Sequence, residues 1–403
     1  MEDVHHQTLS TLRRTVFLVS LPFYIISLLL PVYGKEIGAS VVEIGLFYTA
    51  FSLMTVLLRP LVGWSLDRFG RRGFLLAGVA GYAATMLSFA FVEQVGGMVV
   101  ARIFQGISSS LMWLSAQAII ADVASETARG SAFGSISEAS SRGSIVGTTL
   151  GLVLLNARIS VRGQVTHLGN WRLLFVVYGI ITLAALIFAL RRLPETRPTD
   201  NAHEQQPIQW SRTWVLLLLV TLVTGASVAM ISPILIIFLQ EKLGVGMETL
   251  SWAFLPSALV WALLPSRLGR LADRFGRKPL MLVGLGAAAA SSFVIPALGT
   301  VIALALLWAF QEACYAAGDP AEQALVADLT GRQQRGRAFG IYVTCNGLGA
   351  AIGPLVGAWL YQTFGARVPF YANGVVLALC ALALLLFLRG PVGKPLAGVA
   401  AMQ

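Results

Sequence analysis

Long apolar runs alternate with short polar segments along the whole chain. A helix needs about 20 mostly apolar residues to cross the hydrocarbon core of a bilayer, and twelve runs of this kind occur. In the first half the expected spans are 15–33, 41–66, 73–92, 96–120, 130–155 and 171–190. In the second half they are 214–239, 249–266, 279–298, 301–325, 338–361 and 368–388. The pattern predicts an all-α polytopic membrane protein with 12 transmembrane helices.

The two halves of the chain repeat each other. The stretch GWSLDRFGRR at 63–72 returns as GRLADRFGRK at 269–278, an offset of 206 positions that also relates Asp122 to Asp328. A match held over many positions indicates a duplicated six-helix unit. Because six is even, each half begins and ends on the same side of the membrane. We therefore expect two parallel repeats related by an axis along the membrane normal.

A polar segment with three prolines, RRLPETRPTDNAHEQQPIQWSR, separates the halves. It is too hydrophilic to cross lipid, and we interpret it as a cytoplasmic linker. The expected organisation is an N-terminal six-helix bundle at 1–190, a linker at 191–212, a C-terminal six-helix bundle at 213–390 and a cytoplasmic tail at 391–403.

Composition and charge agree with a membrane chain, since 56% of the residues are hydrophobic and 12% are charged. The net charge of +10 does not indicate a nucleic acid partner, because the positions of the basic residues explain it. With the N-terminus inside, twenty of the 29 Lys and Arg lie on the cytoplasmic side, six outside and three within spans. The positive-inside rule then places both termini in the cytoplasm, and we expect a bacterial inner (plasma) membrane.

Several function classes find no support in the sequence. No Gly-x-x-x-x-Gly-Lys-Ser/Thr loop occurs, so direct driving by ATP is not expected. The three cysteines all fall inside predicted spans without the spacing of a metal site, and no nucleophile and base form a recognisable catalytic group. We expect no enzyme activity, no metal and no cofactor.

The duplicated charged stretch lies, in each half, in the cytoplasmic connection between the second and third spans. Loop charge alone explains its arginines but not its two aspartates or its repeated spacing. We call its defining residues the repeated motif: Gly63, Asp67, Arg68, Gly70, Arg71 and Arg72, then Gly269, Asp273, Arg274, Gly276, Arg277 and Lys278. Gly70 and Gly276 are expected to make the tight turn.

With this motif the chain resembles the major facilitator superfamily, whose signature in this loop runs Gly, three residues, Asp-Arg, one residue, Gly-Arg-Arg/Lys. The resemblance covers the whole chain, and Arg102-x-x-Gln105-Gly106 and Pro194-Glu195-Thr196 add to it, the first being similar to the drug/proton antiporter branch. It implies a rocker-switch carrier in which this loop stabilises the outward-open state. Thr148 stands where that branch has proline in its fifth-helix motif, and the first span carries no acid.

Elementary electrostatics suggests how the motif acts as a conformational latch. We expect Asp67 to approach the N-terminus of the eleventh helix near Gly336, and Asp273 that of the fifth helix near Gly130. Free N–H groups and the helix dipole favour an anion there. Such contacts would exist only when the cytoplasmic side is closed.

Ionisable residues inside spans are costly and are functional candidates by default. Glu138 and Arg142 lie four residues apart on one helix face, either as a static ion pair or as a pair that opens when Glu138 takes a proton. Arg102, with Gln105, is expected to snorkel to the outer surface or to serve as a proton-relay or cavity partner.

The tenth span carries three further carboxylates, Glu312, Asp319 and Glu322. The resemblance implies that helices one, four, seven and ten line the cavity, which makes Glu312 the first choice for a proton or substrate carboxylate. The alternative for each is a satisfied hydrogen bond between helices.

Two further groups complete the candidate residues. Small residues spaced by four let helices approach closely, and the candidates for packing are Gly143, Gly147, Gly151, Gly349, Gly353, Pro354 and Gly357. Candidate cavity aromatics, which otherwise serve packing or interface anchoring, are Phe23, Tyr24, Trp113, Trp308 and Tyr315.

Together these features predict a monomeric secondary active transporter that exports small amphipathic or cationic organic compounds and is driven by a proton gradient. The alternatives are a proton-coupled importer or a metabolite or lipid carrier of the same fold, and, more remotely, a non-transporting membrane receptor.

Overall fold

The computed structural model describes residues 2–123, 129–156, 167–196, 210–263, 276–329 and 335–388. Within these residues the chain is helical and has no strands, as the sequence predicts. It divides into two compact units, Met1–Ala202 (unit 1) and His203–Gln403 (unit 2).

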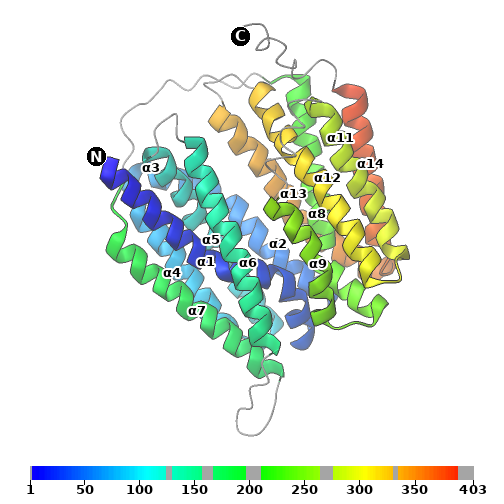
Figure 1. The fold of residues 1–403 in the computed structure, drawn as a ribbon, viewed down its shortest axis with the longest axis horizontal. Coiled ribbons are helices and arrows are strands. Elements are labelled where there is room, and N and C mark those ends of the chain that lie inside the picture. Colours follow the sequence, from blue (N-terminus) through cyan, green and yellow to red (C-terminus); the bar gives the residue numbers. More distant parts are fainter. Residues whose placement is uncertain are drawn as a thin grey trace. The chain divides into compact units, whose positions relative to one another are not determined.

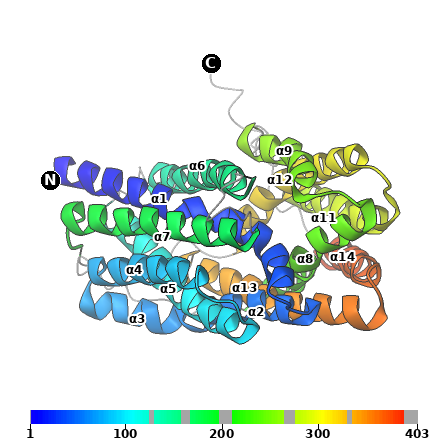
Figure 2. The ribbon, with the colours of Figure 1, turned by 90° about the horizontal axis from the view of Figure 1, so that it is seen from below.

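Unit 1 contains seven described helices (Figure 1), which are α1 (Glu2–Glu36), α2 (Val41–Leu57), α3 (Arg59–Phe69), α4 (Arg72–Phe89), α5 (Val95–Val123), α6 (Arg129–Asn156) and α7 (His167–Arg192). Figure 2 shows α1, α6 and α7 along one side of this unit and α2, α3, α4 and α5 along the other.

The described helices of unit 2 are α8 (Arg212–Leu243), α9 (Met247–Leu263), α11 (Arg277–Val294), α12 (Val301–Leu329), α13 (Arg335–Phe364) and α14 (Val368–Phe387), with a short 3-10 helix at Ile295–Ala297. The neighbours in unit 1 recur here. The pairs α1/α6, α4/α5, α4/α7 and α2/α5 correspond to α8/α13, α11/α12, α11/α14 and α9/α12.

The second expected span, 41–66, has the same bounds in the structure and consists of two helices. It breaks at Leu58 into α2 and α3, because Pro60 lies at the start of α3 and has no N–H for a carbonyl of the preceding turn. The start of α2 is fixed by a capping box in which Ser40 and Glu43 satisfy each other's backbone N–H groups.

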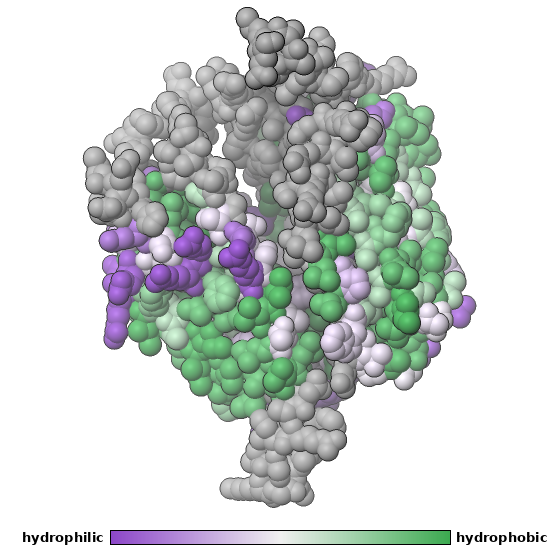
Figure 3. Space-filling view, viewed as in Figure 1, coloured by the Kyte–Doolittle hydropathy of each residue, from purple (hydrophilic) through white to green (hydrophobic). Residues whose placement is uncertain are grey.

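Ten helices of the described residues are long and apolar enough to cross a membrane. The two remaining expected spans correspond to α6 and α9. Helix α6 contains the polar run SISEASSRGS, and α9 is described over only 17 residues. Figure 3 shows hydrophobic residues over much of the visible helical surface, and exposed apolar side chains such as Ile187 on α7 and Leu386 on α14 suit contact with lipid.

Glycines set the closest helix packing in both units. A Cβ atom at Gly147 of α6 would lie 1.8 Å from the Leu21 carbonyl oxygen of α1, and one at Gly353 of α13 would lie 2.2 Å from the Ala226 carbonyl oxygen of α8. Gly143, Gly349 and Gly357 have contacts of the same kind on the same helix pairs, and Pro354 is buried beside them. A Cβ at Gly151 would instead lie 2.6 Å from the Tyr178 hydroxyl of α7. Only glycine permits this approach.

Candidate functional site

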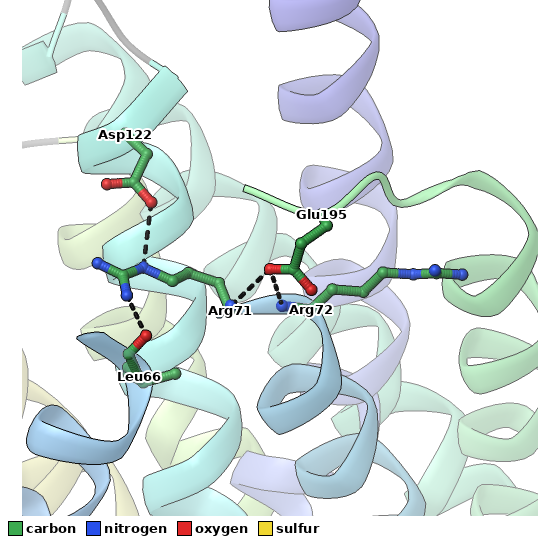
Figure 4. A network of polar contacts seen from close by, with 5 residues as sticks. All are labelled: Leu66, Arg71, Arg72, Asp122 and Glu195. Atoms are coloured by element: carbon green, nitrogen blue, oxygen red, sulfur yellow. Dashed lines mark hydrogen bonds and ion pairs between the residues drawn. The ribbon is translucent and has the colours of Figure 1, made fainter. Parts of the chain in front are cut away.

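The connection between α3 and α4 holds an ion pair between a buried arginine and a half-buried aspartate (Figure 4). Gly70 ends α3 with φ of 93°, a left-handed conformation that suits glycine. The next side chain, Arg71, turns inward and is only 4% exposed. Its Nε lies 3.1 Å from Oδ2 of Asp122 near the end of α5, and its guanidinium also donates to the Leu66 carbonyl oxygen.

Glu195, in the segment that follows α7, reaches back to the same connection. One carboxylate oxygen accepts hydrogen bonds from the backbone N–H groups of Arg71 at 2.7 Å and Arg72 at 3.2 Å. Helix α4 has no side-chain cap of its own, so Glu195 supplies the anion that a helix N-terminus favours. A Cβ at Gly70 would lie 2.6 Å from that carboxylate, so the glycine also leaves the space that Glu195 occupies.

In each unit, the last basic residue of the repeated motif donates hydrogen bonds to carbonyl oxygens at the end of that unit's last helix. Arg72 donates to the Leu190 carbonyl oxygen of α7 at 2.7 Å. Its counterpart 206 positions later, Lys278, donates to the carbonyl oxygens of Leu385 and Leu388 at the end of α14, both at 2.8 Å. A cation at a helix C-terminus satisfies free carbonyl groups and complements the dipole. Each motif therefore fastens its loop to the last helix of its own unit.

The remaining motif residues are placed less fully. Arg68 is exposed, with its guanidinium 5.7 Å from the ring of Trp64. Gly276 has φ of 87° and precedes Arg277, the first residue of α11. Gly63 lies in α3, where an added Cβ would meet nothing within 4 Å. Gly269, Asp273 and Arg274, and the side chain of Asp67, lie outside what the structure describes.

Sequence reasoning missed the two acids of this network. The offset of 206 residues pairs Asp122 with Asp328, and both positions fall near the end of a predicted span. An acid that recurs at the same position of both repeats, just beyond the end of a span, could have been predicted to have a structural role. Glu195 gives no such signal, because it follows the sixth span, where the offset of 206 no longer holds: the sixth spans start at 171 and 368, which are 197 positions apart.

Arg102 does not snorkel to the surface, and that interpretation is wrong. It is 4% exposed, donates from Nε to the Phe47 carbonyl oxygen at 3.0 Å and donates to the side chain of Gln105. Its guanidinium lies 4.5 Å from the ring centre of Phe51. Hydrogen bonds and a ring face together hold this cation inside unit 1, between α2 and α5.

Glu138 and Arg142 form an ion pair along α6, as their spacing suggests. The Glu138 side chain is 58% exposed and that of Arg142 is 69% exposed. On the same helix, the Ser140 and Ser20 hydroxyls lie 3.0 Å apart and link α6 to α1.

Two carboxylates of α12, those of Glu312 and Glu322, are described, and both are half-buried. Glu322 accepts a hydrogen bond from the Thr221 hydroxyl of α8 at 2.8 Å. This is the hydrogen bond between helices that was expected from the sequence as the alternative to a proton or substrate role. Glu312 is half-buried on the same helix. The side chain of Asp319 lies outside the described part of the chain.

The candidate aromatics divide between exposed and packed positions. Phe23, Tyr24 and Tyr315 are 39%, 48% and 39% exposed. Trp308 is half-buried with its ring centre 4.2 Å from that of Phe254, and Trp113 is half-buried in α5. In the described residues no group of three or more His, Cys, Asp or Glu side chains could hold a metal ion.

Comparison with known proteins matches nearly the whole chain. A family model described as the Major Facilitator Superfamily matches residues 15–220 and 217–401. Multidrug resistance protein 1 of Bacillus subtilis (strain 168) is 23% identical over 377 residues, covering 92% of this chain and 94% of that protein. Multidrug resistance protein MdtG of Rahnella sp. (strain Y9602) is 24% identical over 377 residues, covering 89% and 88%.

Solved structures resemble the chain over both units. The nucleoside transporter NupG superposes with a TM-score of 0.76 at 15% identity, covering 95% of this chain and all of that one. A bacterial homologue of the human lysosomal transporter Spinster, inward-facing and unoccupied, superposes with a TM-score of 0.73 at 16% identity, covering 95% and 96%. This likeness confirms the all-α fold predicted from the sequence.

Proposed function

The chain belongs to the major facilitator superfamily, and we propose that this membrane transporter exports small amphipathic or cationic organic compounds in exchange for protons. The observation that carries the proposal is the similarity to two proteins named for multidrug resistance, which extends over about nine tenths of the chain. Exposed Tyr24 and Tyr315 add aromatic surface of the kind that binds amphipathic cations.

A proton gradient is the proposed energy source, with carboxylates of α12 as the coupling groups. An acid at membrane depth is retained at a free-energy cost, which makes it a functional candidate. Glu322 accepts a hydrogen bond from Thr221, the interhelical contact expected of a structural acid. Half-buried Glu312 remains the first choice for the coupling carboxylate, with Asp319 next.

Alternating access is proposed to be biased by the aspartates of the repeated motif. The contacts of Arg71, Arg72 and Glu195 fix the connection after α3, and Asp67 lies in the last turn of that helix. A carboxylate at a fixed helix end can bind the N-terminus of another helix in one conformation and lose it in the other. Such a contact is worth about 0.3–2 kcal/mol, enough to bias two states of similar energy.

We further propose that the protein works as a monomer in a bacterial inner membrane, with both termini in the cytoplasm. Accessibility of single cysteines introduced at the ends of α7 and α14 to an impermeant thiol reagent tests this orientation. Labelling from the outside of intact cells would contradict it.

Transport in proteoliposomes tests the function. A permanently charged cation such as tetraphenylphosphonium is offered to vesicles that are acidic inside, with the membrane potential held at zero by potassium and an ionophore. A proton antiporter accumulates the cation there whatever its orientation, and a symporter accumulates it only when the outside is acidic. Protein-free vesicles are the control.

Glu312→Gln in the same vesicles tests the coupling residue. We expect this variant to lose gradient-driven accumulation. Unchanged accumulation would remove Glu312 from the mechanism, and a failure of the wild type across a panel of amphipathic cations would contradict drug-type export.

A further inference from the structure

A groove of about 550 Å³ lies in unit 1 between the N-terminal part of α1, the first half of α6 and the end of α7. Its charged lining includes Arg13, Arg14, Arg142 and Glu138. Figure 3 shows hydrophilic residues gathered over this end of α1 and α7, above a hydrophobic surface. Unlike the repeated motif, the groove has no role in the transport proposal.

The groove carries an excess of positive charge. Glu138 pairs with Arg142, so its single negative charge is already engaged. Arg13 and Arg14 are both exposed, and neither makes a hydrogen bond or ion pair within the described residues. Three cations around one cavity repel one another, and a multivalent oxygen anion would relieve this repulsion and accept their N–H groups.

The apolar lining lies one helical turn from the cations. Phe17 and Leu18 follow Arg13 and Arg14 by four residues each, so on α1 the apolar pair lies directly beside the charged pair, about 6 Å further along the axis. Phe188 of α7 completes the apolar side. The predicted first span starts at Thr15, which places the arginines at the membrane surface and the apolar residues in its acyl region.

We propose that this groove binds an anionic phospholipid of the cytoplasmic leaflet. The phosphate head group lies among Arg13, Arg14 and Arg142, and an acyl chain runs along Phe17, Leu18 and Phe188. Basic pockets between transmembrane helices on the cytoplasmic side suit such head groups. The net positive charge of the groove repels a cationic cargo, so this site is distinct from the proposed transport pathway.

Lipid binding to the purified full-length protein tests the proposal without any transport measurement. Native mass spectrometry compares phosphatidylglycerol with phosphatidylcholine of identical acyl chains. We expect Arg13→Gln/Arg14→Gln to weaken phosphatidylglycerol binding about 30-fold, since each cation near a phosphate contributes roughly a fivefold factor. The matched control is Arg191→Gln/Arg192→Gln, which removes two exposed cations at the end of α7 that do not line the groove.

A gain of affinity separates binding from misfolding. Glu138→Gln raises the groove's charge and frees Arg142, so phosphatidylglycerol should bind about fivefold more tightly. Equal binding of the two lipids, equal losses in the arginine variant and its control, or no gain in Glu138→Gln would each overturn the proposal. Displacement of the lipid by millimolar inorganic phosphate would show a soluble-anion site instead and would overturn the assignment to lipid.

Discussion

The buried pair of Arg71 and Asp122 gives the sharpest prediction about unit 1. Its two side chains are 5% and 17% exposed, and the atoms that face each other are 3.1 Å apart. Arg71→Met leaves a carboxylate with little water and no cation among the described residues, whereas Asp122→Leu leaves a buried guanidinium with the Leu66 carbonyl as a remaining acceptor. Replacing both removes the two charges together.

The magnitude follows from distance and burial. At an effective dielectric constant of ~20, two unit charges 3.1 Å apart attract by about 5 kcal/mol. Desolvation offsets much of this attraction, so the intact pair adds little net stability, but removing one partner costs about 3–5 kcal/mol. We expect each single variant to lose about 3 kcal/mol and the double variant no more than one single, a coupling of at least roughly 3 kcal/mol.

Equilibrium unfolding in mixed micelles, followed by circular dichroism, measures these free energies. The matched control is the pair of Arg172 and Glu93 in the same unit, whose side chains are 56% and 60% exposed. Exposed pairs contribute about 0–1 kcal/mol, so Arg172→Met with Glu93→Leu should show almost no coupling. A coupling energy for Arg71 and Asp122 as small as that of the control would refute the reasoning.

Three further predictions concern the same unit. Glu195→Ala should lower the free energy of unfolding by about 1 kcal/mol, because α4 loses its cap. The same change should relieve part of the cost of Gly70→Ala, which otherwise pushes a Cβ against the carboxylate, but not all of it, because the φ of 93° remains. Strictly additive losses in the double variant would contradict the contact. Gly147→Val should abolish a monodisperse peak in size-exclusion chromatography by forcing α1 from α6, whereas Gly63→Ala should leave it intact; a normal peak for Gly147→Val would contradict the packing. Asp67→Asn should reduce transport while membrane insertion stays normal, and a wild-type transport rate would exclude the latch.

The sequence was sufficient for the architecture because its signals are long and repeated. Apolar runs of membrane length recur over the whole chain, and the offset of 206 residues relates many positions in the two halves, so local errors do not alter the result. The span expected at 41–66 is confirmed with the same bounds, and only its division at Leu58 into α2 and α3 was not predicted, because hydropathy does not register the N–H group that Pro60 lacks.

The site was harder to predict because its partners are distant in the chain. Arg71 and Glu195 are 124 residues apart, and only the fold brings the carboxylate to the N-terminus of α4. Arg102 was ambiguous for a related reason. Its position near the helix end allowed its side chain to reach the surface. The Phe47 carbonyl and the Phe51 ring hold it inside, and they lie on another helix, so the local sequence does not reveal them.

Exchange of protons for substrate is the central claim, and internal pH tests it most directly. Proteoliposomes acidic inside and loaded with a pH-sensitive dye receive an amphipathic cation while the membrane potential is held at zero. We predict that the cation makes the interior more alkaline with the wild type and not with Glu312→Gln. Uptake of the cation by the wild type with no change in internal pH would contradict proton-coupled export.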